Sequence, residues 1–225
     1  MTSHHKTNLR LDWCSHEAAK YAVEHWHYSR AMPKSKLAKI GVWENDRFIG
    51  VVIFGVGATS ALVTRYGLTP IEGCELIRVA LTSHQSPVSR IVAIALSMIR
   101  RTYSGLRLVV SFADPEQGHT GGIYQAGGWI YSGRTQSSPE YIFAGKRWQG
   151  RSWRNSHDAT TDLASVEVVM GSSKHRYLMP LDAEMRARIL PLAVPYPKRA
   201  SEASSDAPAI HAGEGGAAPT LTLQQ

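Results

Sequence analysis

The sequence predicts a single α/β domain, built on a mixed β-sheet with flanking helices. Strand patterns and helix patterns alternate along the chain, which is typical of this class of fold. A nearly continuous apolar run over residues 107–112 indicates a strand in the middle of a sheet. With 225 residues, 43% of them hydrophobic, the chain is large enough for one full-sized core.

The first third of the chain predicts one helix and three strands. A helix is expected over residues 15–26, because Ser15 is a good N-cap and small apolar residues recur on one face. Two runs, 39–43 and 48–54, surround a polar turn and predict a hairpin. Residues 75–81 alternate with a period of two, which predicts a further strand.

The middle of the chain predicts a long amphipathic helix. It should begin with Ser86 as its cap and Pro87 at its first position, and Gly105 should end it. The apolar strand follows this helix directly. The remaining expected elements are a short helix over 122–126 and strands over 129–131, 141–144 and 174–179.

Composition narrows the classes of function. Lys and Arg number 25 against 18 Asp and Glu, and this excess suggests a polyanionic partner, usually nucleic acid, although a basic surface also serves solubility. Two cysteines outside any C-x-x-C pattern indicate neither a disulfide scaffold nor a zinc knuckle. The pair of glycines at 55–57 lacks the third glycine of a dinucleotide-binding turn.

The ends of the chain predict its organisation and location. Residues 198–225 are rich in Ala, Ser, Gly and Pro, so a disordered tail is expected behind a domain over 1–197. The N-terminus has no apolar leader, and glycines interrupt the longest apolar stretch, 49–62. We therefore expect a cytoplasmic protein with no membrane partner.

Two candidate groups lie at the ends of predicted elements. His27 and Tyr28 follow the first helix, and imidazole and phenolate are both competent iron ligands, although an aromatic cluster at a helix end would look the same. Asp114 ends the buried strand, where ligands collect in open α/β sheets. It is a candidate general base or metal ligand, or the first residue of an Asp-Pro turn.

Two further features could bind a ligand. In the segment 118–128, three glycines precede the short helix and leave backbone N–H groups bare, which favours an anion or a polarised carbonyl. Tyr124 on this helix either faces the site or packs in the core. Arg78 is a single charge in an apolar strand, so it either points into a cleft or pairs with Glu72 or Glu75.

Cations and tryptophans alternate in the segment 134–154, with Glu140 as its only acid. Interleaved charges and indoles suit phosphates and unstacked bases, whereas a solvated basic face is the alternative. The residues expected to contact nucleic acid here are Arg147, Trp148 and Arg151.

Over residues 37–145 the order of elements resembles the core of the GNAT acyltransferases, and Gly127-Gly128-Trp129 resembles the entry to one of their strands. The resemblance implies acetyl-CoA or another acyl donor along residues 75–81. The stretch 84–90 departs from the family because it has no glycine, so its amides cannot approach a pyrophosphate in the usual way.

The chain also resembles the Mom family of Mu-like bacteriophages, in five segments: 27–28, 75–79, 111–115, 118–127 and 174–181. This resemblance implies conversion of adenine in double-stranded DNA to N6-(carbamoylmethyl)adenine, which protects phage DNA from host restriction. It implies an iron dependence and a small-molecule donor.

By the same resemblance, His27, Tyr28, Asp114 and Tyr124 form the catalytic group. The first three of these would also be the iron ligands, and Arg78 would hold the donor or the substrate. The need to extrude a paired adenine agrees with a basic, aromatic surface.

Two other functions stay open at this point. A GNAT N-acyltransferase acting on a small amine or a protein would bind acetyl-CoA and leave DNA unmodified. A DNA-binding module without catalysis would bind DNA in a salt-dependent way and would tolerate the loss of Asp114 and Tyr124.

Overall fold

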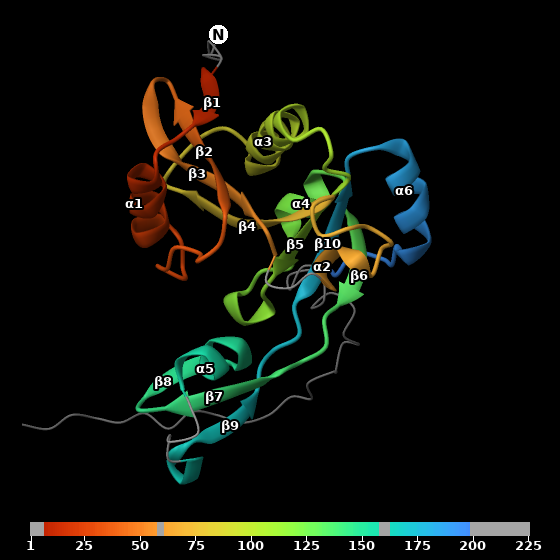
Figure 1. The fold of residues 1–225 in the computed structure, drawn as a ribbon. Helices are drawn as coiled ribbons and strands as arrows, with labels where there is room; N and C mark the ends of the chain where they lie inside the picture. The colour runs from red at the N-terminus through yellow and green to blue at the C-terminus, as the bar shows by residue number, and fades with distance from the viewer. Residues whose placement is uncertain (1–6, 58–60, 158–162, 199–225) are drawn as a thin grey trace, which may run out of the picture.

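The computed structural model describes residues 7–57, 61–157 and 163–198, which form a seven-stranded sheet with helices around it and a separate three-stranded sheet (Figure 1). The predicted tail, apart from Lys198, lies outside the described residues. Among the described residues, no helix is long and apolar enough to cross a bilayer. The strands of the large sheet are β1 (Leu9–Trp13), β2 (Leu37–Glu44), β3 (Arg47–Gly55), β4 (Gly73–Leu81), β5 (Leu108–Ala113), β6 (Ile130–Arg134) and β10 (His175–Pro180). The helices beside it are α1 (His16–Trp26), α2 (Ala61–Thr64), α3 (Val88–Thr102), α4 (Gly122–Ala126) and α6 (Ala183–Ile189), with short 3-10 turns at η1 (Pro115–Gln117) and η3 (Leu190–Leu192).

The large sheet confirms the predicted mixed α/β architecture. Its order is β1-β2-β3-β4-β5-β10-β6, and β4 with β5 is the parallel pair. That pairing runs from Gly73 opposite Leu108 to Leu76 opposite Ser111. Since β4 continues to Leu81 and β5 to Ala113, the two strands separate beyond the last pair. This divergence opens the sheet at its centre.

Helices α1 and α3 pack on opposite faces of this sheet. Side chains alternate along a strand, so neighbours on β3 face different helices. Val51 and Ile53 of β3 pack in the cluster of α1, whereas Val52 and Phe54 pack in the larger cluster of α3. The centre of the sheet is thereby buried on both sides, and each large apolar side chain contributes about 1.5–3 kcal/mol.

Residues between β6 and β10 form the second sheet, which the sequence pattern did not predict. Its order is β8-β7-β9, with β7 (Pro139–Phe143), β8 (Lys146–Gln149) and β9 (Glu167–Met170). It also carries α5 (Gly150–Ser156) and η2 (Leu163–Ser165). The expected strand over 141–144 thus belongs to this small sheet and not to the large one.

The predicted start of the long helix is wrong in one detail. Ser86 does not cap it; Pro87 is the N-cap residue, without a side-chain hydrogen bond. Instead, the buried carboxylate of Glu44 at the end of β2 accepts hydrogen bonds from the backbone N–H groups of Gln85 (2.9 Å) and Ser86 (2.8 Å). The start of α3 is therefore held by a carboxylate from the neighbouring hairpin.

Candidate functional site

A cleft of about 540 Å³ occupies the place where β4 and β5 separate. Trp26 at the end of α1, the outer half of β4 and the end of β5 form part of its wall. The glycine-rich loop 118–122 and Tyr124 of α4 complete it. Three segments that are far apart in the sequence therefore meet at one opening, which the parallel pair creates by diverging.

His27 and Tyr28 lie at the rim of this cleft. The Tyr28 ring is in edge-on contact with His119, with ring centroids 5.6 Å apart, and His119 lines the cleft. The His27 ring packs on Tyr28 at 4.2 Å. His119 was not among the predicted site residues, although it lies inside a segment that the sequence singled out.

The protonation state of His27 follows from its neighbours. Its Nδ1 accepts the backbone N–H of Ser29 at 3.1 Å and lies 2.8 Å from the Ser29 Oγ. Because an N–H group can only donate, Nδ1 is unprotonated and the ring carries its proton on Nε2. Burial, with the charges of Arg78 and His119, lowers the pKa of His27 to about 4. The ring is thus a neutral hydrogen-bond donor near pH 7.

Arg78 lies close enough to this rim group for its charge to act on His27 and Tyr28. One guanidinium nitrogen donates to the Ile77 carbonyl at 2.9 Å, while the buried Nε has no hydrogen-bond partner among the described residues. Burial lowers the pKa of Arg78, and Tyr28 and Glu75 oppose that effect. An arginine stays charged under these conditions. Arg78 therefore keeps a buried donor that is available for an acceptor.

Tyr124 both packs in the core and lines the cleft, so its two predicted positions, in the core and facing the site, are one and the same. Its ring contacts Trp129 and Tyr177, with centroids 5.0 and 4.9 Å away. Its hydroxyl lies 2.7 Å from the Oγ of Ser111, a residue that the sequence analysis did not select. Burial raises the pKa of Tyr124 to about 12, so the phenol is protonated at neutral pH.

The loop before α4 is fixed by Tyr177. The Tyr177 hydroxyl donates to the Thr120 carbonyl and lies 3.2 Å from the Gln125 amide nitrogen, which donates to it. Gly121 has a φ of 85°, and a Cβ there would lie 2.3 Å from the Tyr177 ring. Glycine is required at this position both for the backbone conformation and for the close approach.

The carboxylate of Asp114 binds the segment just before β10 and its own turn. It pairs with Lys174 at 3.2 Å and accepts hydrogen bonds from Ser172 Oγ (3.3 Å) and the Glu116 backbone N–H (3.1 Å). Burial alone would raise the pKa of Asp114, but Lys174 and these hydrogen bonds hold it below its usual range. The Asp114 carbonyl accepts the backbone N–H of His119 at 3.1 Å. Asp114 therefore orders the turn that carries His119. This is the Asp-Pro turn that the sequence analysis gave as the alternative to a general base or metal ligand.

The residues expected to bind iron do not fit a three-ligand site. Among the described residues, no group of three or more His, Cys, Asp and Glu side chains could hold a metal ion. Asp114 is paired with Lys174. In the His27 ring, Nε2 carries the proton, and the lone pair of Nδ1 accepts the Ser29 N–H. His27 and Tyr28 come together as predicted, but Asp114 does not join them.

The site also does not fit the pyrophosphate of CoA at the start of α3. The Glu44 carboxylate already occupies the N–H groups of Gln85 and Ser86, and Pro87 has none. Burial opposes ionisation, yet these hydrogen bonds lower the pKa of Glu44. An anion approaching these amides would meet a charged carboxylate.

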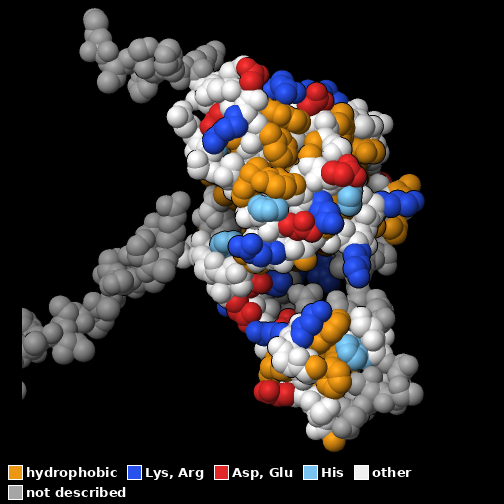
Figure 2. Space-filling model, turned by 90° about the vertical axis from the view of Figure 1, so that its left-hand side faces the viewer, with side chains coloured by type: hydrophobic (Ala, Val, Ile, Leu, Met, Phe, Trp, Pro, Cys, Tyr) orange, Lys and Arg blue, Asp and Glu red, His pale blue; other side chains and the backbone are white. Residues whose placement is uncertain are grey.

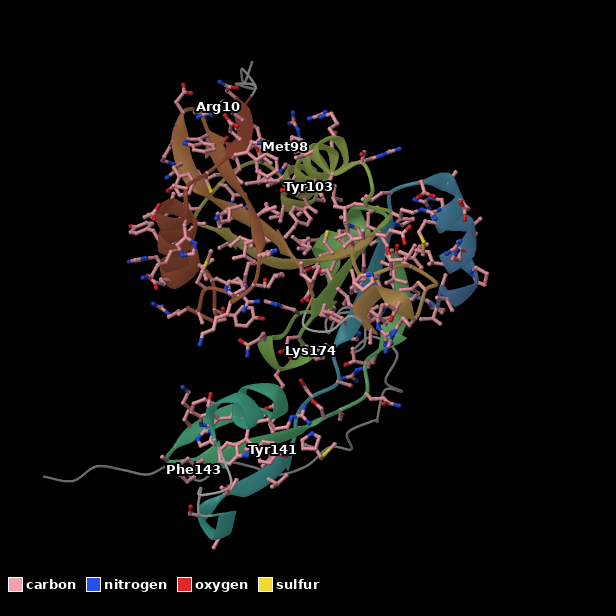
Figure 3. The ribbon with its side chains drawn as sticks, viewed as in Figure 1. Arg10, Met98, Tyr103, Tyr141, Phe143 and Lys174 are labelled. Atoms are coloured by element: carbon pink, nitrogen blue, oxygen red, sulfur yellow. The ribbon has the colours of Figure 1, made fainter. Side chains whose placement is uncertain are left out.

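The basic segment 134–154 differs from its expected role in part. Trp153 is buried and stacks on Tyr141, with centroids 5.0 Å apart, so it is the core of the small sheet and not a platform for a base (Figure 3 labels Tyr141). Arg147 pairs with Glu140 and, at 3.4 Å, with Glu116 of η1. Lys146 covers the Trp148 ring at 3.9 Å.

Arg151 lies in α5, and its side chain is outside the described part of the structure. Figure 2 shows Lys and Arg side chains on both sides of the hollow between the large body and the small sheet. Lys174, in the connection between β9 and β10, lies between the large body and the small sheet (Figure 3). The positive charge is therefore arranged around a groove, not spread over one segment.

Comparison with known proteins places these features in context. The model of the Mom protein family matches residues 8–198. A curated relative, methylcarbamoylase mom of Escherichia phage Mu, is 30% identical over 134 residues, which are 58% of this chain and 56% of the relative. The match therefore spans little more than half of the relative's length.

Solved structures with a similar arrangement include an acetyltransferase of Bacillus subtilis in complex with CoA, with a TM-score of 0.43 and 11% identity; the match covers 79% of this chain and 100% of that one. A putative acetyltransferase of Acinetobacter baylyi has a TM-score of 0.46 and 17% identity, with 79% and 94% covered. The likeness concerns the course of the chain and not its chemistry.

Proposed function

Since the chain belongs to the Mom protein family, we propose that it is an enzyme that modifies adenine in double-stranded DNA. The name of the phage Mu relative, methylcarbamoylase, supports transfer of a small group that contains an amide. We propose that this group is carbamoylmethyl, an isomer of methylcarbamoyl, so that the product is N6-(carbamoylmethyl)adenine. Such a modification shields phage DNA from host restriction. The observation that carries the proposal is the cleft where β4 and β5 diverge, with aromatic and imidazole groups from three segments around it.

The cleft suits a single extruded base. Its volume of about 540 Å³ falls within the range of about 300–1,000 Å³ that is usual for small-molecule pockets. The amino group of adenine is paired inside a duplex, so the base must leave the stack to react. Trp26 and Tyr28 supply aromatic surfaces on which an unstacked base can lie.

The reaction replaces one N–H bond of the adenine amino group with an N–CH₂ bond. The donor is a small molecule that carries the carbamoylmethyl unit on a leaving group; the leaving group departs with its electron pair, and the amine proton is transferred to a base. We assign the proton to the imidazole of His119 on the cleft wall. His27 and Arg78 are donors suited to the carbonyl oxygen of the transferred group.

Asp114 and Tyr124 support this site in different ways. Asp114 orders the turn before His119 through Lys174, and Tyr124 forms the inner wall. The cations around the groove, with Arg147 and with Lys146 over the Trp148 ring, would bind the DNA backbone. Arg147 must exchange part of its pairing with Glu140 and Glu116 for phosphate, so this contact should be sensitive to salt.

Mass spectrometry of nucleosides tests the proposal. DNA from bacterial cells that express the chain is digested and compared with DNA from cells that carry an empty vector. We expect a new deoxyadenosine derivative whose mass corresponds to one carbamoylmethyl group in place of one hydrogen. Unmodified deoxyadenosine, from cells that contain folded and soluble protein, would refute the proposal; salt-dependent DNA binding without modification would identify a binding module.

A further inference from the structure

One buried serine joins the three elements that meet at the head of the cleft. Ser111 of β5 is fully buried, with 0% of its surface exposed. Its Oγ lies 2.8 Å from the carbonyl oxygen of Leu76 on β4 and 2.7 Å from the hydroxyl of Tyr124 on α4. Leu76 and Ser111 are the last residues at which β4 and β5 pair. The hydroxyl therefore lies at the point from which the cleft opens.

The direction of each hydrogen bond in this chain is fixed by a count of protons. A carbonyl oxygen has no proton, so the Leu76 carbonyl can only accept. Ser111 has a single hydroxyl proton and must donate it to Leu76. The bond between Ser111 and Tyr124 then has one possible donor, which is the phenol. The Tyr124 proton is committed to Ser111, and the phenol oxygen retains only acceptor capacity.

We propose that Ser111 is a positioning residue that acts through Tyr124, so that the phenol oxygen accepts a hydrogen bond from the amino group of the substrate base. This inference rests on the proposed function. An adenine amino group carries two N–H bonds, and the one that does not react needs an acceptor when the base leaves its pair. Tyr124 in this arrangement orients the amine and donates no proton to it.

A double-mutant cycle tests this role. Ser111→Ala removes the acceptor of the phenol proton, and Tyr124→Phe removes the phenol oxygen. Each single change should lower the initial rate of adenine modification by about 10-fold or more, within the range that coupled contacts produce. The double variant should be no slower than Tyr124→Phe. Rate losses that multiply in the double variant would overturn the proposal.

Two further variants serve as a control and as a conservative replacement in this test. In the described part of the chain, the buried hydroxyl of Ser132 of β6 has no hydrogen-bond partner, so Ser132→Ala should modify DNA at the rate of the parent chain. Ser111→Cys keeps the side-chain size with a much weaker donor, and it replaces Ser111→Ala in the cycle if the latter does not fold. It should reduce the rate in the parent and leave the rate of Tyr124→Phe unchanged; an added loss there would contradict the inference.

A second readout does not depend on catalysis. The proton between Tyr124 and Ser111 is buried and hydrogen-bonded, so its NMR signal should exchange slowly with solvent. Tyr124→Phe should abolish this signal, and Ser111→Ala should shift it and speed its exchange. A signal unaffected by Ser111→Ala would refute the proton assignment. Absence of DNA modification by the parent chain, with this signal intact, would refute the proposed function alone.

Discussion

Replacing Gly121 with alanine should damage the loop that forms one wall of the cleft. Its φ of 85° lies in the left-handed region, which costs a residue with a Cβ about 1–2 kcal/mol. The new Cβ would lie 2.3 Å from the Tyr177 ring, which is itself fully buried and cannot retreat. Overpacking of this kind adds about 1–3 kcal/mol. The expected loss in the free energy of unfolding is about 2–5 kcal/mol.

Gly128 provides the matched control for that change. Its φ of 69° is also left-handed, but nothing lies within 4 Å of the Cβ that alanine would add. Gly128→Ala should therefore cost only the backbone strain of about 1–2 kcal/mol. Urea unfolding of both variants, followed by circular dichroism, gives the difference directly. Equal losses in the two variants would refute the reasoning, because the contact with Tyr177 would then contribute nothing.

Three other predictions concern charged groups around the site. The pKa of His27 is about 4 in the folded chain and about 6.5 in the unfolded chain, so the unfolded chain binds more protons between these pH values. The free energy of unfolding should therefore fall by about 1 kcal/mol as the pH drops through this window, after allowance for partial exposure. His27→Gln should flatten this dependence in urea titrations at several pH values. Glu44→Gln should lower the free energy of unfolding by about 1–2 kcal/mol, because it weakens two hydrogen bonds that hold the start of α3. A loss below about 0.3 kcal/mol, the scatter of such measurements, would contradict this prediction. Asp114→Asn and Lys174→Met should each lower the free energy of unfolding by about 1 kcal/mol, and the double variant should lose clearly less than the sum of the two. Additive losses would show that the ion pair does not contribute to stability.

Elements that depend on local patterns were predictable from the sequence. Ser15 caps α1 as expected, its side chain accepting the Ala18 N–H at 3.1 Å. The hairpin, β5 and the five residues of α4 also lie where period and turn chemistry place them. In each case the signal is carried by residues that are neighbours in the chain. These local preferences predict the folded structure correctly because the tertiary packing favours the same secondary structure.

Pairing between distant segments could not be read in the same way. The strand at 141–144 was recognisable, but its partner β9 is an exposed strand of four residues whose pattern gives no register. Asp114 was a sound candidate at the end of a central strand, yet its partner Lys174 lies 60 residues further on. Ser111 lies in a segment that the sequence singled out, but its role depends on the carbonyl of Leu76 and the phenol of Tyr124 around it. The directions of side chains at the site are thus a product of tertiary structure.

The central claim is that adenine is modified in the cleft beside the end of α1, and two tyrosines test it most directly. Tyr21 and Tyr28 belong to α1 and its end, and each is 51% exposed, but only Tyr28 contacts His119. Quantitative nucleoside mass spectrometry on DNA from cells that express equal amounts of Tyr28→Ala or Tyr21→Ala gives the comparison. The modified fraction should fall about 10-fold or more for Tyr28→Ala, because the ring on which the base lies is lost and such stacking contributes about 1–3 kcal/mol, and it should stay at the parent level for Tyr21→Ala. Equal modification by the two variants would contradict the account.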